Sequence, residues 1–437
     1  MYKDIKNTVN VALLGAGTVG WGVVELLENN AGEISQKAGI NIKIKTVMEK
    51  SPELVKELNN KGYNTTQEID DILKDDDISI VVELMGRIEP AKTFMAKALE
   101  AGKHVVTANK DVIAEHGNEL FDLAVKHNVD FMFEAAVGGG IPIIRPLKQC
   151  LAANNIQAIM GIVNGTTNYM LSKMASDGMS YDDVLKESQE KGYAEKDPTA
   201  DVGGIDAARK IAILSSIAFN TRVCLGDVYI EGIQSVDVND IEYADEFGYV
   251  IKLLAIGKCS NGKGIDVRVH PTFLPKDHPL ASVNGVFNAI FVTGDYVGDT
   301  MFYGQGAGRK ATASAVCGDI IDVARDIVTN NPSRVLCTCF DDKPICSQND
   351  VETPFYIRMI VSDRPGVLAA IAAAFGSNEV GLRQVVQKET IDGCAELVLI
   401  THNVSFANMS LALQTLKAVS TVNKICSVIR VEDNQLN

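Results

Sequence analysis

An acid and a lysine, Asp206 and Lys210, are spaced four residues apart in a segment suited to acid–base chemistry. The glycine pair 203–204 precedes Ile205, and the apolar run that follows predicts a helix beginning near Ile205. On such a helix the two side chains lie on one face, about one turn apart. A lysine held in this way can exchange a proton with a reacting oxygen.

Two further carboxylates lie in the loop before this helix. Glu195 and Asp201 flank Pro198 and are placed to meet the amino group of a small substrate. The alternative is that Asp206 and Lys210 form an ordinary surface ion pair, and the spacing alone favours that interpretation. Motifs elsewhere in the chain are needed to choose between a catalytic pair and a surface ion pair.

The N-terminal segment has the pattern of a dinucleotide-binding turn. Residues 9–14 form an apolar run typical of a buried parallel strand, and a helical pattern continues through Leu27. The turn between the strand and the helix consists of Gly15, Ala16, Gly17, Thr18, Val19 and Gly20. Its glycines let a pyrophosphate approach the backbone amides at the helix N-terminus, where the helix dipole favours an anion. The alternative is a glycine-rich packing turn.

Strands and helices alternate beyond this turn. Strand patterns at 42–47 and 78–84 alternate with helical patterns that end near Gly62 and span 90–101. This alternation predicts an α/β fold with a doubly wound parallel sheet, which binds ligands beyond the carboxyl ends of its strands.

Composition excludes several classes of function. The net charge is −15, from 41 basic and 56 acidic residues, so binding to nucleic acid or an anionic membrane is not expected. No apolar run is long enough to span a bilayer, and nine scattered cysteines favour a reducing compartment, so we expect a cytoplasmic protein. Cys337, Cys339 and Cys346 lack zinc-site spacing and are interpreted as buried or loop thiols.

Motifs spread over residues 9–328 jointly resemble those of homoserine dehydrogenases. Besides the glycine-rich turn they are Val82 to Gly86, Gly102 to Lys110, Glu134 to Pro142, Asn164 to Tyr169, Glu195 to Lys210 and Tyr303 to Gly308.

The resemblance implies NAD(P)-dependent interconversion of L-homoserine and L-aspartate 4-semialdehyde, in threonine, methionine and isoleucine biosynthesis. It implies a Rossmann-type nucleotide domain over residues 1–137 plus about 308–330. An α+β substrate-binding and dimerisation domain over 138–307 follows, in a homodimer or homotetramer.

The resemblance also assigns roles to single residues. Lys210 matches the proton donor, Asp206 the neighbouring carboxylate, Lys110 the lysine between cofactor and substrate, and Glu195 the residue that holds the amino group. Further substrate contacts are expected at Asp201, Gly165 and Thr166, and a further cofactor contact at Gly308. A monovalent cation, Na⁺ or K⁺, is implied at Glu134 and the backbone carbonyls of Val137, Gly139 and Ile141.

Three positions depart from the family pattern. Met48 and Glu49 stand where many relatives have an arginine for the 2′-phosphate of NADP. An acid near this strand end suits a free ribose hydroxyl, so NAD is favoured, although Lys50 leaves NADP open. Gly203 replaces an acidic or amide residue, and Arg87 stands where a second glycine is usual.

The C-terminal part forms a second module. Residues 331–353 read as a linker with short strand structure, and residues 354–437 follow a βαββαβ pattern. The sequence of 363–369 resembles that of ACT domains, which have a ferredoxin-like fold. This implies an amino-acid effector, with threonine the first candidate, bound near Asp363, Gly366, Val367 and Leu368. The alternative is a structural or dimerising domain that binds nothing.

Two rival functions remain at this point. One is another Rossmann dehydrogenase that acts on an amino-acid aldehyde, which the co-occurrence of the 164–169 and 195–210 motifs disfavours. The other is a catalytically silent amino-acid sensor, which the presence of Lys110, Asp206 and Lys210 opposes.

Overall fold

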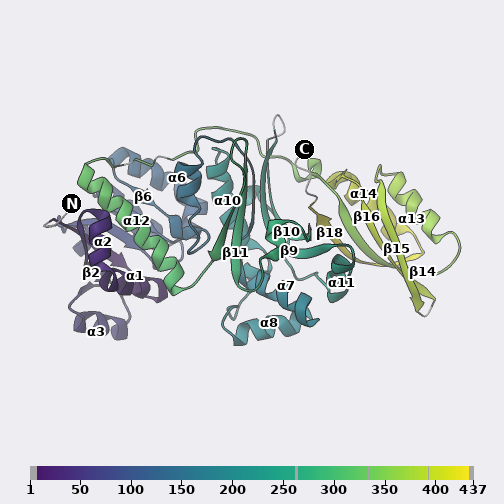
Figure 1. The fold of residues 1–437 in the computed structure, drawn as a ribbon, viewed down its shortest axis with the longest axis horizontal. Coiled ribbons are helices and arrows are strands. Elements are labelled where there is room, and N and C mark those ends of the chain that lie inside the picture. The colour runs from purple at the N-terminus through teal and green to yellow at the C-terminus, as the bar shows by residue number, and fades with distance from the viewer. Residues whose placement is uncertain (1–6, 261–263, 333, 336, 392, 433–437) are drawn as a thin grey trace. The chain divides into compact units, whose positions relative to one another are not determined.

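The computed structural model describes residues 7–260, 264–332, 334–335, 337–391 and 393–432, in two compact units (Figure 1). Unit 1 comprises residues 1–156, 212–225 and 293–342. Unit 2 comprises residues 157–211, 226–292 and 343–437.

Unit 1 contains a six-stranded parallel sheet in the order β3-β2-β1-β4-β5-β6. The direction of winding reverses between β1 and β4, so the carboxyl ends of these two strands mark the switch point where such sheets bind ligands. The predicted doubly wound parallel sheet is confirmed. Its strands are β1 (Thr8–Leu14), β2 (Asn41–Met48), β3 (Asn64–Thr66), β4 (Ile78–Glu83), β5 (His104–Thr107) and β6 (Phe131–Met132).

A long helix from later in the chain returns to unit 1. It is α12 (Arg309–Thr329), which lies beside α1 (Thr18–Asn29) and α2 (Ala31–Ala38) in Figure 1. The approach is close, because a Cβ at Gly22 of α1 would lie 2.8 Å from the carbonyl oxygen of Arg309. The other helices and strands of this unit are α3 (Pro52–Asn60), α4 (Ile69–Leu73), α5 (Ala91–Glu100), α6 (Lys110–His127), η1 (Glu134–Ala136), η2 (Pro146–Cys150) and β12 (Gly298–Gln305).

Unit 2 is built on a mixed sheet in which strands run in the order β11-β7-β9-β10-β18-β14-β16-β15, with β8 also pairing to β10. The pairing of β10 with β18 is parallel, whereas β9 pairs with β10 and β14 with β18 in antiparallel fashion. The strands are β7 (Ile156–Ile162), β8 (Tyr229–Ile230), β9 (Tyr249–Ser260), β10 (Gly264–Pro275), β11 (Phe287–Gly294), β14 (Phe355–Ser362), β15 (Leu382–Ile391), β16 (Cys394–Thr401) and β18 (Val422–Val431).

The helices of unit 2 position its polar side chains. The predicted helix at Ile205 begins at that residue, as α10, and its last turns belong to unit 1. The helices are α7 (Gly165–Asp177), α8 (Tyr181–Glu190), α9 (Thr199–Val202), α10 (Ile205–Ala218), η3 (Leu225–Asp227), α11 (Val238–Glu246) and η4 (Pro279–Ser282).

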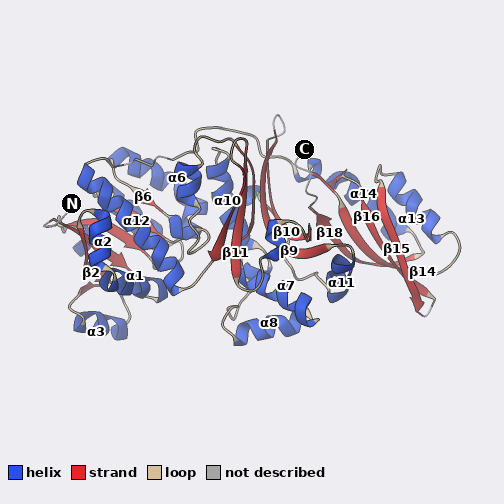
Figure 2. Cartoon of the chain, viewed as in Figure 1, coloured by secondary structure: helices blue, strands red, loops and turns tan. Residues whose placement is uncertain are grey.

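The C-terminal part of unit 2 has the predicted βαββαβ pattern. The order β18-β14-β16-β15 is that of a ferredoxin-like sheet, and α13 (Val367–Gly376) and α14 (Phe406–Ala418) lie together beside it in Figure 2. Helix α14 begins earlier than the predicted Leu411, because Ser405 caps it by accepting a hydrogen bond from Asn408 N. Before β14 lie η5 (Gln348–Asp350) and β13 (Glu352–Thr353), which pairs with β17 (Val404–Ser405).

A buried charged cluster joins α11 to this C-terminal sheet. Asp240 of α11 is completely buried, and its Oδ1 accepts hydrogen bonds from Arg358 Nε at 2.6 Å and from the Tyr356 hydroxyl at 3.0 Å. The Ser427 hydroxyl donates to its Oδ2. Arg358 also donates to Glu396 at 3.0 Å. Since buried charges are stable only when paired and hydrogen-bonded, this cluster fixes the C-terminal sheet against α11.

Candidate functional site

Lys210 and Asp206 form a partly buried pair rather than an exposed one. Lys210 Nζ donates to Asp206 Oδ2 at 2.6 Å and to the carbonyl oxygen of Val163 at 2.7 Å. The two side chains are only 12% and 11% exposed. The alternative of an ordinary surface ion pair therefore fails. Two acceptors hold the lysine nitrogen at the end of β7.

Asn164, which sequence reasoning did not single out as a site residue, connects the two acids. Its Nδ2 donates to Asp201 Oδ1 at 2.7 Å and to Asp206 Oδ2 at 2.9 Å. Its Oδ1 accepts from Thr167 N at 2.9 Å and so caps α7. The sequence could have pointed to this residue, because an asparagine directly after an apolar strand and before a helix start stands at an N-cap position. One side chain thus begins a helix and organises two carboxylates.

The other predicted substrate residues lie in different surroundings. Burial raises the pKa of Asp201, and the nearby Asp206 charge adds to this effect. Thr166, in the first turn of α7, donates to the carbonyl oxygen of Tyr193 at 2.6 Å, and Gly165 begins that helix. Glu195 is exposed on the loop before α9.

The glycine-rich turn of unit 1 has the geometry of a pyrophosphate cradle. Gly15 has a φ of 95°, and a Cβ at Gly20 would lie 2.2 Å from the carbonyl oxygen of Gly15. Helix α1 starts at Thr18, and no side chain caps its N-terminus. The first amides of α1 therefore have no acceptor within the helix, which suits a bound phosphate oxygen. Residues 15–20 fit the dinucleotide that the sequence predicts.

Glu49 is tied to this turn. Its Oε2 accepts from Ala16 N at 2.8 Å, and its Oε1 accepts from Lys50 N at 2.8 Å and from Ser51 N at 2.9 Å. Burial raises the pKa of this carboxyl, but hydrogen bonds from the three amides outweigh it and hold the pKa below its usual range. A carboxylate offers about four acceptor positions, so one remains for a ribose hydroxyl.

Lys110 and Gly308 both stand at helix starts in unit 1. Lys110 is the first residue of α6, directly beyond the carboxyl end of β5, and Gly308 precedes α12 with a φ of 116°. Arg87, the departure noted in the sequence, adopts a glycine-like φ of 61°, and its carbonyl accepts from Asn109 Nδ2 at 2.7 Å. The arginine therefore keeps the turn that a glycine would make.

The Glu134 carboxylate is fully engaged by hydrogen-bond donors. Its Oε1 accepts from Ile143 N and Ile144 N, and its Oε2 accepts from the backbone N–H and the guanidinium of Arg145. The segment from Val137 to Ile141 turns sharply, with positive φ at Gly138 and Gly139. A cation there would be bound by backbone oxygens. In the described residues, no three His, Cys, Asp or Glu side chains gather as a metal site.

The C-terminal turn borders a cavity of about 400 Å³. Its lining includes Asp363, Gly366, Val367 and Leu368, together with Gln387 of β15. Gly366 precedes α13 with a φ of 89°, and no side chain caps this helix. The four predicted effector residues thus share one cavity at a helix N-terminus.

Comparison with known proteins identifies the family. Residues 142–321 match the homoserine dehydrogenase family, residues 15–134 the homoserine dehydrogenase NAD-binding domain, and residues 355–421 the ACT domain. A homoserine dehydrogenase of Synechocystis sp. is 47% identical over 432 residues, which cover 97% of this chain and 99% of that protein. The chain belongs to the homoserine dehydrogenase family.

Solved structures agree with this assignment. A crystal structure of a homoserine dehydrogenase from Thiobacillus denitrificans is 42% identical, with a TM-score of 0.93 over 98% of this chain and 99% of that chain. A hyperthermophilic archaeal homoserine dehydrogenase mutant, solved in complex with NADPH, is 29% identical, with a TM-score of 0.62 over 72% of this chain and 97% of that one.

The protein is therefore an NAD(P)-dependent homoserine dehydrogenase with a C-terminal ACT domain, an enzyme of amino-acid biosynthesis. In the part of the chain that the structure describes, no helix is both long and apolar enough to cross a membrane.

Proposed function

We propose that Lys210 is the proton donor when L-aspartate 4-semialdehyde is reduced, and the acceptor in the reverse reaction. The observation that carries this is the position of its Nζ, fixed by Val163 O and Asp206. An ammonium has three donors, and the third can reach a substrate oxygen. Hydride from the nicotinamide builds negative charge on that oxygen, which a nearby cation stabilises and protonates. Kinetics of a Lys210 variant test this assignment.

The surrounding groups have supporting roles in this proposal. Asp206 orients Lys210, and Asn164 holds Asp206. Asp201, Gly165 and Thr166 contribute to the substrate site, and Glu195 recognises the amino group of homoserine. Lys110, beyond the carboxyl end of β5, stands between cofactor and substrate.

We propose that the enzyme uses NAD at least as well as NADP. Glu49 keeps a negative charge at the end of β2, where it accepts a ribose hydroxyl and repels a 2′-phosphate. Replacing it by an uncharged isostere, Glu49→Gln, should shift the ratio of kcat/KM for NAD over that for NADP toward NADP by about tenfold. That factor corresponds to about 1.4 kcal/mol of lost repulsion.

The matched control for this experiment is Glu33→Gln, which neutralises an exposed glutamate of α2 in the same unit. Its coenzyme ratio should equal that of the wild type. Both coenzymes have to be compared, because an archaeal relative was solved in complex with NADPH. A strong NADP preference of the wild-type enzyme would contradict the proposal.

We propose that threonine binds at the Asp363 to Leu368 turn and changes activity. The uncapped α13 N-terminus can receive a carboxylate. Gly366→Ala should weaken the response about tenfold or more in half-effective threonine concentration, because alanine is strained at a φ of 89°. The measurement is homoserine oxidation by the full-length enzyme over a threonine titration, with other amino acids as a panel.

Gly376→Ala is the control, because this glycine ends the same helix and a Cβ there meets nothing within 4 Å. It should keep the wild-type response. If no amino acid alters activity or binds in calorimetry, the ACT domain has a structural role only. Point variants are preferred to truncation near Glu352, which would remove β18 and the partners of Asp240 together.

The remaining proposals concern the assembly, the cation, the localisation and the domain boundaries. We infer a homodimer or homotetramer, which agrees with the exposed apolar side chains of Tyr296, Met301 and Tyr303 on and before β12. Glu134, together with the backbone carbonyls of Val137, Gly139 and Ile141, is proposed to hold Na⁺ or K⁺. The nine cysteines are consistent with the reducing environment of the cytoplasm. We propose the domain boundaries expected from the sequence, which are residues 1–137 plus about 308–330, 138–307, 331–353 and 354–437.

A further inference from the structure

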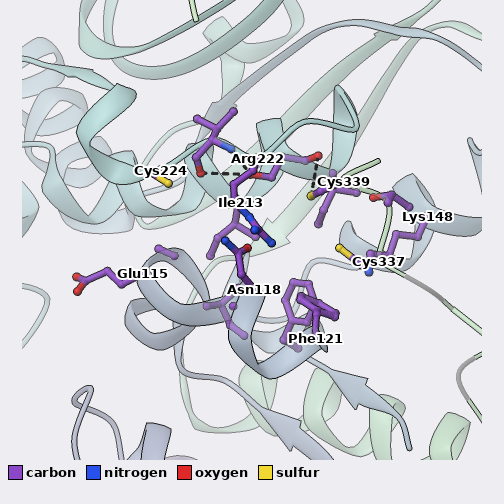
Figure 3. A pocket seen from close by; sticks show the side chains of 17 residues that line it. Glu115, Asn118, Phe121, Lys148, Ile213, Arg222, Cys224, Cys337 and Cys339 are labelled. Carbon is purple, nitrogen blue, oxygen red and sulfur yellow. Dashed lines mark hydrogen bonds between the residues drawn. The ribbon is translucent and has the colours of Figure 1, made fainter. Parts of the chain in front are cut away.

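A small cavity in unit 1 lies outside every site described so far. Its walls come from α6, from the last turns of α10 and from the segments around Arg222 and Cys337 (Figure 3). Its volume is about 60 Å³, room for a few water-sized molecules and too little for a coenzyme or an amino acid. Any ligand of this cavity must therefore be very small.

Two cysteines separated by one residue face this cavity. Cys337 and Cys339 are both partly buried, and Figure 3 shows their side chains beside it. The Cys339 thiol donates a hydrogen bond to the carbonyl oxygen of Ser216 in α10, at 3.6 Å. The two cysteines thus border the same small cavity, one residue apart in the chain.

Positive charge surrounds Cys337. The Lys148 ammonium lies over the rings of Phe121 and Phe133, 5.0 and 5.3 Å from their centroids. Burial lowers the pKa of Lys148, and the strongest opposing influence is the charge of Cys337. The neighbouring Cys339, with the charges of Lys148 and Arg222, holds the pKa of Cys337 below its usual range. Such surroundings stabilise a thiolate, the reactive form of cysteine.

We propose that Cys337 and Cys339 form a dithiol site that a small peroxide, such as hydrogen peroxide, oxidises to a disulfide. The Cys337 thiolate attacks one peroxide oxygen, the O–O bond breaks, and hydroxide leaves and takes up a proton to become water. The Cys339 thiol then attacks the sulfenic sulfur. The S–O bond breaks, the Cys339 proton leaves with that oxygen as a second water, and the S–S bond forms.

Each oxidation consumes one peroxide, which accepts the two electrons that the cysteines lose. Two equivalents of a small thiol reverse it and are themselves joined as a disulfide. The cavity suits this reagent, because a peroxide has only two heavy atoms. By contrast, burial raises the pKa of Cys317 to about 12, so that thiol stays protonated.

Helix α10 connects this site to catalysis in the chain itself. It carries Asp206 and Lys210 near its start and lines the cavity with Ile213, Ser216 and Ile217 near its end. Disulfide formation removes the thiol hydrogen of Cys339 that faces Ser216 O. Oxidation is therefore expected to change kcat for homoserine, reversibly with a thiol reductant.

The test treats the reduced full-length enzyme with hydrogen peroxide and maps its peptides by mass spectrometry. We expect loss of two hydrogens in the peptide that carries Cys337 and Cys339, at a rate at least tenfold above oxidation of the exposed Cys150. Cys339→Ser should stop at a Cys337 sulfenic acid, trapped by dimedone. Lys148→Met should slow the first step about tenfold.

Several results would overturn the proposal. They are equal oxidation rates at Cys150 and Cys337, a disulfide that joins either cysteine to Cys224, and absence of a dimedone adduct in Cys339→Ser. If Lys148→Met does not fold, the Cys339→Ser result and the rate comparison with Cys150 still decide. Each of these readouts is independent of the catalytic role proposed for Lys210.

Discussion

The Lys210→Ala variant is expected to oxidise homoserine on the order of 100-fold or more slowly than the wild type, measured as kcat with NAD. The reason is the loss of the only group that we assign to proton transfer. Binding of NAD should be retained, because the glycine-rich turn that fits the pyrophosphate is untouched. Circular dichroism and calorimetric titration with NAD establish that the variant is folded.

The matched control is Lys74→Ala. Lys74 pairs with Asp70 of α4 at the same four-residue spacing and in the same order, but the side chains are 78% and 58% exposed. An exposed pair contributes little to stability, so this variant should keep wild-type kinetics. Turnover of Lys210→Ala near the wild-type rate would show that another group transfers the proton.

The largest effect on stability is expected from Asp240→Asn. The change removes the carboxylate charge that faces the buried Arg358, and breaking a buried pair costs about 3–5 kcal/mol. Burial raises the pKa of the Tyr356 hydroxyl, and the neighbouring charge of Asp240 adds to this effect, so the hydroxyl remains a donor. In the variant, Tyr356 and Arg358 therefore compete for an amide oxygen, which is a weaker acceptor than a carboxylate. The measurement is the urea midpoint of the full-length enzyme, which should fall clearly.

Asp245→Asn serves as the control on the same helix. Asp245 pairs with Lys276 at 2.6 Å, but its side chain is 78% exposed, so the urea midpoint should be nearly unchanged. The double variant Asp240→Leu with Arg358→Met should recover much of the lost stability, because it removes both charges. Equal midpoints for Asp240→Asn and Asp245→Asn would mean that the buried cluster contributes little.

Elements with a strong local pattern could be predicted from the sequence. The apolar strand, the glycine-rich turn and the helix at residues 9–27 depend on neighbours in the chain, and β1 and α1 appear where they were expected. The four strands of the ACT domain were recognised for the same reason. The N-terminus of α14 was placed too late, because its start depends on the cap by Ser405 rather than on apolar periodicity.

Contacts between distant residues could not be predicted in this way. Asn164 meets Asp201 and Asp206 only because the end of β7 lies near α9 and the start of α10 in the folded chain. Glu49 was predicted to face a ribose, but its bond to Ala16 N depends on the parallel pairing of β1 with β2. The pairing of Asp240 with Arg358 likewise joins positions more than a hundred residues apart. No local periodicity encodes these partners.

The parallel pairing of β10 with β18 has a consequence for how the chain is made. Thr272 and Phe273 pair with Arg430 and Val431, which a ribosome adds roughly 8–30 seconds later at about 5–20 residues per second. Until then the nascent chain exposes that stretch of β10 as an open strand edge, the kind of surface that recruits other chains. Newly synthesised protein should therefore depend on chaperones until β18 has left the ribosome.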